Sequence, residues 1–390
     1  MNFSGFERPN DLVGIRNIIL VMAIADCAEP PARMIAEGIE NAVSVSQYQG
    51  CIDMQVVPTL IGVARNPNVY GTVLVAMGCE SQEPSSLREA IATAGKPVEI
   101  ISIQETGGIR KAVARGREVV KRMAEAARKL RRTPMDISRL VVGMKCGGSD
   151  TTSGIAANPA IGVMTDMLID AGAAVVMGEP IEAVGAEEAL GARAKNDQVR
   201  QDILKWIGDE EKRWTVPGAA LDLMCMGNIA GGITTLEEKS QGSVHKSGHR
   251  LISGVLKNRD DYLEPVLPGG GLFLQEGTHA DSQAMTYMAA AGCHLIIYPT
   301  GRGGSFGHAI CPLIKVTGNP ETWARMGDDF EINASTIMEG KESIESVGKR
   351  IFNEVLAVAS GKKTIGEELG LFNFAIWKRD PRLEILLELQ

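Results

Sequence analysis

Short apolar runs that each end in glycines and small polar residues restrict the fold of this chain more than any other feature. Runs such as 17–24, 71–77 and 173–177 have the length and composition of fully buried strands. The segments between them have the spacing of amphipathic helices, as over 108–130. Strands that alternate with helices form parallel sheets, because the crossover helices cover both faces. The pattern therefore predicts an α/β fold with mainly parallel sheets and helices on both faces.

The chain has 390 residues, which exceeds the size at which single hydrophobic cores stop growing. A polar stretch at 131–136 contains Pro134 and is typical of a boundary. We therefore predict two Rossmann-like lobes, an N-terminal α/β lobe over 1–133 and a C-terminal α/β lobe over 134–390. We expect the second lobe to hold most of the motifs that could carry chemistry. The expected strands are 17–24, 71–77, 98–103, 138–144, 173–177, 271–274 and 293–298, and the expected helices are 31–45, 86–94, 108–130, 163–171, 186–207 and one from about 343, followed by an exposed tail.

Charge and composition exclude several classes of partner. The net charge of −8 disfavours nucleic acid and anionic membranes, and 4% aromatic residues give little surface for base stacking. The N-terminus has no signal-peptide pattern, and no apolar run approaches the roughly 20 residues that span a bilayer. The seven cysteines show no CxxC pair, which favours free thiols over a disulfide framework or zinc ribbon. We expect a cytoplasmic protein that binds neither nucleic acid nor membrane.

Four polar clusters follow the ends of buried runs, at 78–80, 145–153, 178–182 and 299–305. In open parallel sheets the carboxyl ends of the strands meet at the ligand crevice, where loop amides and helix N-termini gather. We therefore expect these clusters to line one site.

The cluster that begins at Lys145 offers the richest chemistry. Its paired glycines let backbone amides approach an anion, Cys146 is a possible soft metal ligand, and Asp150 is a possible hard ligand or base. Asn158 has an amide suited to substrate hydroxyls. The alternative is an ordinary glycine turn whose serine and aspartate cap the next helix, with Asn158 at the helix start.

Four further residues have side chains suited to acid–base, ligand or anion chemistry. Glu179 lies between a glycine and a proline after a strand, as a base or metal ligand does, although most glutamates are solvated. Glu238 and Lys239 follow a Gly-Gly and Thr-Thr pair, so they either face the site or belong to a capped helix start. Arg302 lies in a glycine loop suited to gripping a carboxylate, with a surface salt bridge as the alternative.

Taken together, these stretches resemble the altronate and galactarate dehydratase family over nearly the whole chain. Several spaced motifs in one order are far more specific than any single glycine loop. The matching motifs are Gly5-Phe6-x-Arg8-Pro9, Val13-Gly14-x-Arg16-Asn17, Gly78-Cys79-Glu80, Cys146-Gly147-Gly148-Ser149-Asp150, Ser153-Gly154, Ala157-Asn158-Pro159, Gly178-Glu179, Gly185-Ala186-Glu187, Gly227-Asn228, Ala230-Gly231-Gly232, Thr234-Thr235, Glu238-Lys239-Ser240, Thr300-Gly301-Arg302-Gly303, Phe306-Gly307, Pro312 and Ile314-Lys315.

The resemblance implies a hydro-lyase that removes water from a sugar acid and forms a 2-keto-3-deoxy acid. It also implies a divalent metal, Fe²⁺ or alternatively Mn²⁺, acting as a Lewis acid. Chemistry and motif position together suggest three groups of residues. The catalytic residues would be Asp150, Glu179 and Lys239; the substrate would contact Arg16, Asn17, Ser149, Asn158, Thr300, Arg302 and Ser305; and the metal ligands would be Cys146, Glu179 and Glu238.

A related enzyme, sulfolactate sulfo-lyase, gives the main alternative. Dehydratases of the family begin with a small histidine-bearing domain, whereas this chain starts at the catalytic region, as the sulfo-lyase large subunit does. That subunit shares Lys145-Cys146 and the run Ser149-Asp-Thr-Thr-Ser-Gly154. We therefore expect a large subunit that works with a separate small subunit, as part of an oligomer. The leaving group is water or sulfite, and a non-catalytic metabolite-binding scaffold is a further alternative.

Overall fold

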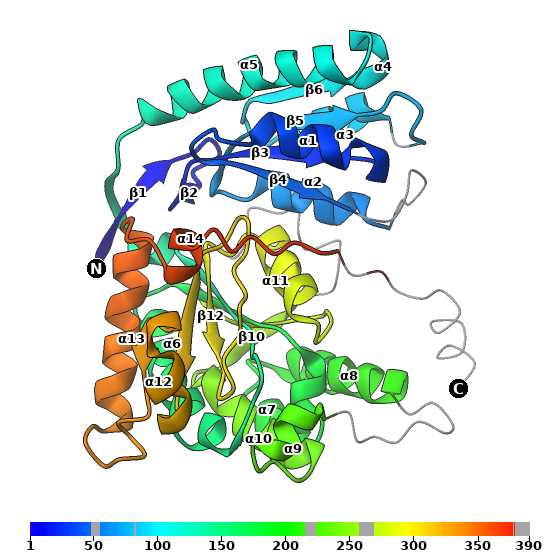
Figure 1. Cartoon of the computed structure of the whole chain (residues 1–390). Helices are drawn as coiled ribbons and strands as arrows, with labels where there is room; N and C mark the ends of the chain where they lie inside the picture. Colours follow the sequence, from blue (N-terminus) through cyan, green and yellow to red (C-terminus); the bar gives the residue numbers. More distant parts are fainter. Residues whose placement is uncertain (48–54, 82, 215–223, 257–268, 377, 379–390) are drawn as a thin grey trace.

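Two parallel sheets, each covered by helices on both faces, form the computed structural model of this chain (Figure 1). The structure describes residues 1–47, 55–81, 83–214, 224–256, 269–376 and 378. The smaller sheet has the order β4 (Ala42–Ser46), β3 (Ile18–Ala23), β5 (Val69–Ala76) and β6 (Val98–Ser102), with all neighbours parallel. Buried residues of α1 (Glu29–Ala36) and α5 (Ile109–Arg128) cover one face, and those of α2 (Val57–Arg65) and α3 (Pro84–Ala92) cover the other.

The larger sheet has seven parallel strands and carries most of the chemistry. Its order is β10 (Ile252–Leu256), β11 (Gly271–Gln275), β9 (Ala174–Met177), β8 (Val141–Met144), β12 (Leu295–Pro299), β13 (Leu313–Thr317) and β14 (Ile332–Asn333). One face packs on α6 (Asn158–Asp170), α8 (Asp197–Trp214) and α13 (Ile344–Ala359), and the other on α11 (Asp281–Ala290). The predicted fold class is confirmed. Shorter helices complete this part: α7 (Glu187–Gly191), α9 (Met226–Ala230), α10 (Leu236–Val244), α12 (Pro320–Met326) and α14 (Ile365–Glu368).

The N-terminal strand joins a third, antiparallel sheet of order β2 (Val13–Gly14), β1 (Asn2–Glu7) and β7 (Thr133–Asp136). Strand β7 occupies the polar stretch in which we placed the boundary between lobes. The division at 133/134 stays a prediction. Among the described residues, no helix combines the length and the apolar character that crossing a lipid bilayer requires.

A buried turn, Asn66-Pro67-Asn68, connects the two parallel sheets. Each asparagine side chain is fully buried and donates to two backbone carbonyls of the other sheet's layer. Because buried amides in a fully bonded network are costly to separate, this turn holds the two layers in a fixed relation. The bonds run from Asn66 Nδ2 to Ala289 O (2.7 Å) and Cys293 O (2.9 Å), and from Asn68 Nδ2 to His294 O (2.7 Å) and Ile310 O (3.0 Å).

Three expected helices were wrong in extent, and some strands were missed. The helix expected over 163–171 begins five residues earlier, at Asn158. The helix expected over 31–45 ends at Ala36, because Gly38 and Asn41 adopt positive φ angles of 70° and 60°, and the alternating Val43 and Val45 then enter β4. The helix expected over 186–207 is broken between α7 and α8. Strands β1, β2, β4, β7, β10, β13 and β14 were not expected. The tail expected after the helix from about 343 is described over 360–376 and at 378, where it forms α14 and buries Thr364 and Ile376. The rest of the tail and Cys51 lie outside the described residues.

Candidate functional site

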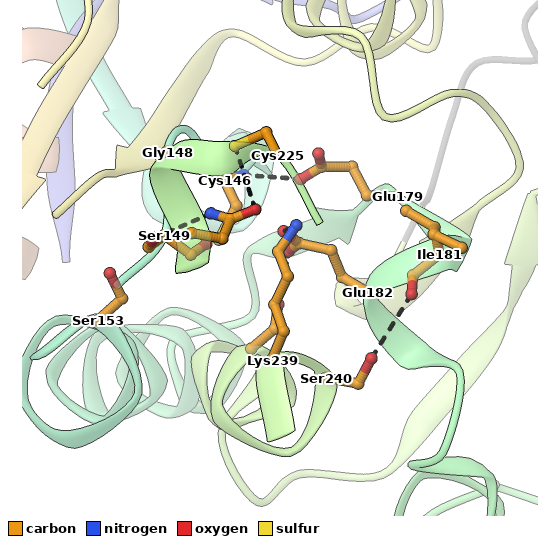
Figure 2. Close-up of polar contacts among 12 residues, drawn as sticks. Cys146, Gly148, Ser149, Ser153, Glu179, Ile181, Glu182, Cys225, Lys239 and Ser240 are labelled. Atoms are coloured by element: carbon orange, nitrogen blue, oxygen red, sulfur yellow. Dashed lines mark hydrogen bonds and ion pairs between the residues drawn. The ribbon is translucent and has the colours of Figure 1, made fainter. Parts of the chain in front are cut away.

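The site lies at the carboxyl ends of the adjacent strands β8 and β9 (Figure 2). Cys146 follows β8 and Glu179 follows β9, and the Cys146 N–H donates to Glu179 Oε2 at 2.7 Å. Glu179 has a left-handed φ of 68°, which non-glycine residues adopt at a cost and keep where surrounding contacts hold them. Glu182 comes from the short 3-10 helix Pro180–Ala183 that follows directly. Only 2% of Glu179 is exposed, so the alternative that it is a solvated loop residue is wrong. Its role as a base or metal ligand stays a prediction.

Cys146, Glu179 and Glu182 form a buried group of potential metal ligands. Cys146 Sγ and one carboxylate oxygen from each glutamate lie within 4.8 Å of one another. A thiol together with two carboxylates suits borderline divalent ions such as Fe²⁺ better than Ca²⁺ or Mg²⁺, which prefer oxygen ligands alone. The donor set therefore fits the divalent metal that we expected from the sequence, with Glu182 in place of Glu238.

Lysines neutralise the carboxylates of this group. Lys145 Nζ lies 2.8 Å from Glu179 Oε1 and 2.9 Å from Asp281 Oδ1. Glu182 is paired twice, with Lys239 Nζ at 3.2 Å from Oε1 and Lys246 Nζ at 2.7 Å from Oε2. Buried charges are stable only when they are paired and hydrogen-bonded, so three ammonium groups and three carboxylates hold each other in this interior.

Burial and these neighbouring charges shift the pKa values of the potential ligands in different directions. Burial and the Glu182 carboxylate raise the pKa of Glu179 to about 6, against the opposing effect of Lys145. Burial also acts to raise the pKa of Glu182, but Lys246, Lys239 and Lys145 together hold it well below its usual value. Burial raises the pKa of the Cys146 thiol to about 11. Because a ligand thiol must be deprotonated, metal binding at neutral pH should release a proton.

The raised pKa of Glu179 predicts a pH dependence of stability in the metal-free protein. An acid with a pKa of about 6 when folded and 4.5 when unfolded stabilises the fold below pH 4.5 and loses that contribution as the pH rises to about 6. The free energy of unfolding of the wild type, relative to Glu179→Gln, should therefore fall by about 2 kcal/mol across this interval. Urea unfolding of both proteins at several pH values measures the difference. Parallel curves would show that the pKa is not raised.

A pocket of about 260 Å³ adjoins the buried group, between α10 and the segment 149–158. Lys239 connects the two, because it pairs with Glu182 and also lines the pocket. Five residues that we predicted as site residues line this pocket, namely Ser149, Asp150, Asn158, Glu238 and Lys239. The structure therefore brings these five together beside the Cys146 group.

Asp150 has a structural part in the pocket wall. Its Oδ1 accepts from Thr152 Oγ1 (2.7 Å) and from Ser153 N (3.0 Å) and Oγ, and its Oδ2 accepts from Asn319 Nδ2 at 2.6 Å. A Cβ at position 301 would lie 2.1 Å from the Asp150 carboxyl, so only glycine fits there. Asp150 thus caps its own turn, as in the alternative that we gave, and its role as a base stays a prediction.

The loop after β12 braces the loop after β8. Thr300 Oγ1 donates to the carbonyls of Gly148 (3.2 Å) and Gly303 (3.1 Å), and Gly301 N also donates to Gly148 O. The side chains of Arg302 and Ser305 are exposed on this loop. Nearby, Asn158 Nδ2 donates to Gly242 O, while its buried Oδ1 has no hydrogen-bond partner among the residues that the structure describes. The substrate-binding roles predicted for Thr300, Arg302 and Ser305 stay predictions.

Three predicted site residues have other partners. Glu238 is exposed, and its carboxylate accepts from Thr234 N (2.8 Å) and Oγ1 (2.6 Å), which is the helix-start alternative. Arg16 forms a two-bond ion pair with Glu367, with Nε and Oε1 at 2.6 Å, and so ties the segment before β3 to α14. Asn17 accepts from Arg8 at 2.6 Å. These three side chains are outside the group around Cys146. Glu238 caps a helix start, and Arg16 and Asn17 bond to other parts of the chain.

Several residues of the site received no role from the sequence, although the predicted cluster 178–182 includes Glu182. Glu182 lies three residues after Glu179, a spacing that returns a second carboxylate to the same turn, and this signal was available. Ser243, Lys246 and Asp281 had no such signal, because tertiary packing brings them in from α10, the turn after it and α11. Tyr298 packs against the glycine loop, so that a Cβ at Gly147 would lie 2.6 Å from its ring, and its hydroxyl donates to Asp281 at 2.7 Å.

Comparison with known proteins identifies the family. Residues 137–382 match the model of the D-galactarate/altronate dehydratase C-terminal domain, and residues 5–128 match the D-galactarate dehydratase/altronate hydrolase second domain. The chain belongs to the galactarate/altronate dehydratase family. This confirms the predicted resemblance.

The proteins that resemble this chain include two kinds of lyase. The chain is 32% identical to (2R)-sulfolactate sulfo-lyase subunit beta of Chromohalobacter salexigens, over 96% of each protein. It is 30% identical to altronate dehydratase of Bacillus subtilis, over 96% of this chain and 77% of that protein. It is 31% identical to galactarate dehydratase (L-threo-forming) of Escherichia coli, over 95% of this chain and 75% of that protein. Assignment to a family of lyases is thereby confirmed.

Proposed function

We propose that this chain is a metal-dependent dehydratase that removes water from a sugar acid and forms a 2-keto-3-deoxy acid. The observation that carries the proposal is the buried group of Cys146, Glu179 and Glu182 beside a pocket lined by predicted substrate residues. Membership of the galactarate/altronate dehydratase family, with altronate and galactarate dehydratases among the relatives, supports the reaction class.

Cys146, Glu179 and Glu182 would hold the metal, which we propose to be Fe²⁺, with Mn²⁺ as the alternative. When bound, such an ion supplies Lewis acidity toward the carboxylate and hydroxyl oxygens of a hydroxy acid. A dehydratase of this kind also needs a base for the poorly acidic α-proton. Of the two predicted bases, Glu179 fits better, because burial and the Glu182 carboxylate raise its pKa to about 6, near neutral, while the Asp150 carboxylate is engaged in capping its own turn and in bonding Asn319.

Lys239 would bind the carboxylate of the substrate, because its ammonium lies between the buried group and the pocket. Hydrogen bonds to charged groups contribute ~1.5–3 kcal/mol, so Lys239→Met should raise the KM for the substrate acid about 10- to 100-fold. Steady-state kinetics with the active acid measures this change. Gln241→Ala, on the same helix and at the same pocket, should change KM much less. An unchanged KM in Lys239→Met would contradict the proposal that Lys239 binds the substrate carboxylate.

Carbon–sulfur cleavage is the second candidate. The relative named (2R)-sulfolactate sulfo-lyase subunit beta matches this chain over 96% of both lengths. This match supports carbon–sulfur cleavage as the alternative reaction. That name also supports a separate small subunit and an oligomeric assembly for this chain. A cytoplasmic location is the natural setting for such metabolism and stays part of the proposal.

The deciding experiment is an assay of the chain with its small partner. We would co-express the chain with the small subunit encoded beside it, purify both anaerobically with Fe²⁺, and supply aldonic acids, aldaric acids and sulfolactate. A 2-keto-3-deoxy acid would establish the dehydratase, whereas sulfite and pyruvate would establish the sulfo-lyase. If neither product forms in the metal-loaded complex, both candidates are wrong.

A further inference from the structure

We propose that Ser243 and Lys246 are positioning residues that clamp one oxygen of Glu182 and leave its other oxygen for the metal. The inference rests on the metal centre of the proposed function. Neither residue stands in a motif that pointed to the site, and both reach it through tertiary packing. Ser243 belongs to α10, and Lys246 belongs to the 3-10 turn His245–Ser247 that continues it.

The clamp consists of three short hydrogen bonds around Glu182 Oε2. Ser243 Oγ lies 2.6 Å and Lys246 Nζ 2.7 Å from this oxygen, and Lys246 Nζ lies 2.6 Å from Ser243 Oγ. An ammonium group only donates and a carboxylate only accepts, so the directions are fixed. The Ser243 hydroxyl accepts a hydrogen bond from Lys246 Nζ and donates one to Glu182 Oε2. All three side chains are buried, so water does not compete for these bonds.

The other oxygen of Glu182 is held much less firmly. Oε1 has Lys239 as its ion-pair partner, at 3.2 Å, and the Lys239 side chain is 14% exposed at the pocket. In Figure 2 Lys239 approaches Glu182 from α10, on the helix that also carries Ser240. Oε2 is therefore saturated by buried donors, while Oε1 becomes available as soon as Lys239 turns toward a substrate. This asymmetry assigns Oε1 as the ligand atom of Glu182.

Lys246 extends the clamp to a second ligand. Its Nζ lies 3.3 Å from Cys146 Sγ, so one fully buried ammonium group contacts both the sulfur and the carboxylate. Residues three apart on a helix share a face, which lets Ser243 and Lys246 act on the same oxygen. Partners of this kind orient metal ligands, and their loss typically lowers metal affinity ~10–100-fold.

Ser243→Ala tests the clamp without changing any charge. The matched control is Ser240→Ala, because Ser240 is equally buried one turn earlier on α10 and donates to the carbonyl of Ile181 at 3.5 Å, not to a ligand (Figure 2). Co²⁺ titration of the full chain, followed by thiolate-to-cobalt absorption, gives the affinity and reports whether Cys146 is bound. Circular dichroism verifies that each variant is folded.

We expect Ser243→Ala to bind Co²⁺ about 10- to 100-fold more weakly than the wild type, with Ser240→Ala unchanged. Lys239→Met should bind Co²⁺ no more weakly than the wild type, because Lys239 is not part of the clamp. Equal affinities in Ser243→Ala and the wild type would overturn the clamp, and so would equal weakening in both serine variants. If the wild type itself binds no Co²⁺, the metal centre of the proposed function is wrong, and this role falls with it.

Discussion

Replacement of Cys146 by serine should lower the affinity of the chain for Fe²⁺ or Co²⁺ by more than about 100-fold, since the loss of outer partners alone costs ~10–100-fold. The substitution removes the soft donor from the group of Cys146, Glu179 and Glu182. A serine hydroxyl keeps its proton at neutral pH and is a poor ligand, whereas a thiol loses its proton on binding. Anaerobic calorimetric titration with Fe²⁺ measures the affinity, and lyase activity should fall in parallel.

Cys225→Ser is the matched control for this prediction. Cys225 is exposed, and its thiol donates to Asn228 Oδ1 at 3.3 Å, in the same part of the molecule but outside the group of potential ligands (Figure 2). Its affinity for Fe²⁺ should match that of the wild type. Retention of tight binding by Cys146→Ser, or an equal loss in Cys225→Ser, would contradict the assignment of Cys146 as a ligand.

Glu182→Gln should destabilise the metal-free protein by about 3–5 kcal/mol, the usual cost of removing one partner of a buried ion pair. Glu182 is 1% exposed and is the counter-charge of Lys246, which is completely buried, and of Lys239. Glutamine keeps the size of the side chain but leaves both ammonium groups without this carboxylate. Urea unfolding at pH 7, where the lowered pKa keeps Glu182 ionised, measures the loss.

Glu238→Gln provides the contrast for that experiment. The Glu238 carboxylate is exposed and only caps Thr234, so its neutralisation should change stability much less than Glu182→Gln does. It should also leave metal affinity unchanged. If Glu238→Gln lowers metal affinity and Glu182→Gln does not, the ligand set that we predicted from the sequence would be preferred to the one that we propose from the structure.

Reasoning from strand ends explains why part of the site was predictable. Cys146 and Glu179 each follow a buried apolar run, and carboxyl ends of neighbouring parallel strands meet. The structure places them on adjacent strands, joined by a backbone hydrogen bond. The spacing of three residues from Glu179 pointed to Glu182 as a ligand, but motif position favoured Glu238. The structure favours Glu182, because it is buried beside Lys239 of α10 and Lys246 of the turn after α10, whereas Glu238 is exposed.

The same limit applies to the fold. Continuous apolar runs such as that of β5 are recognisable because every residue faces a core. Strand β13 was missed although it is buried throughout, because Lys315 and Thr317 interrupt its apolar character, and Lys315 is accommodated near Glu331, which lies just before β14. Arg16 appeared as a substrate residue by motif, yet its partner Glu367 is distant in sequence. Contacts between distant segments were thus the common source of error.

The most direct test of the account is anomalous diffraction from crystals of the chain loaded anaerobically with Fe²⁺, with data collected at the iron absorption edge. We predict one strong peak bounded by Cys146 Sγ and the carboxylates of Glu179 and Glu182. A peak at another site, or no peak at these three residues in protein that binds Fe²⁺ stoichiometrically, would contradict the central claim that they form the metal centre.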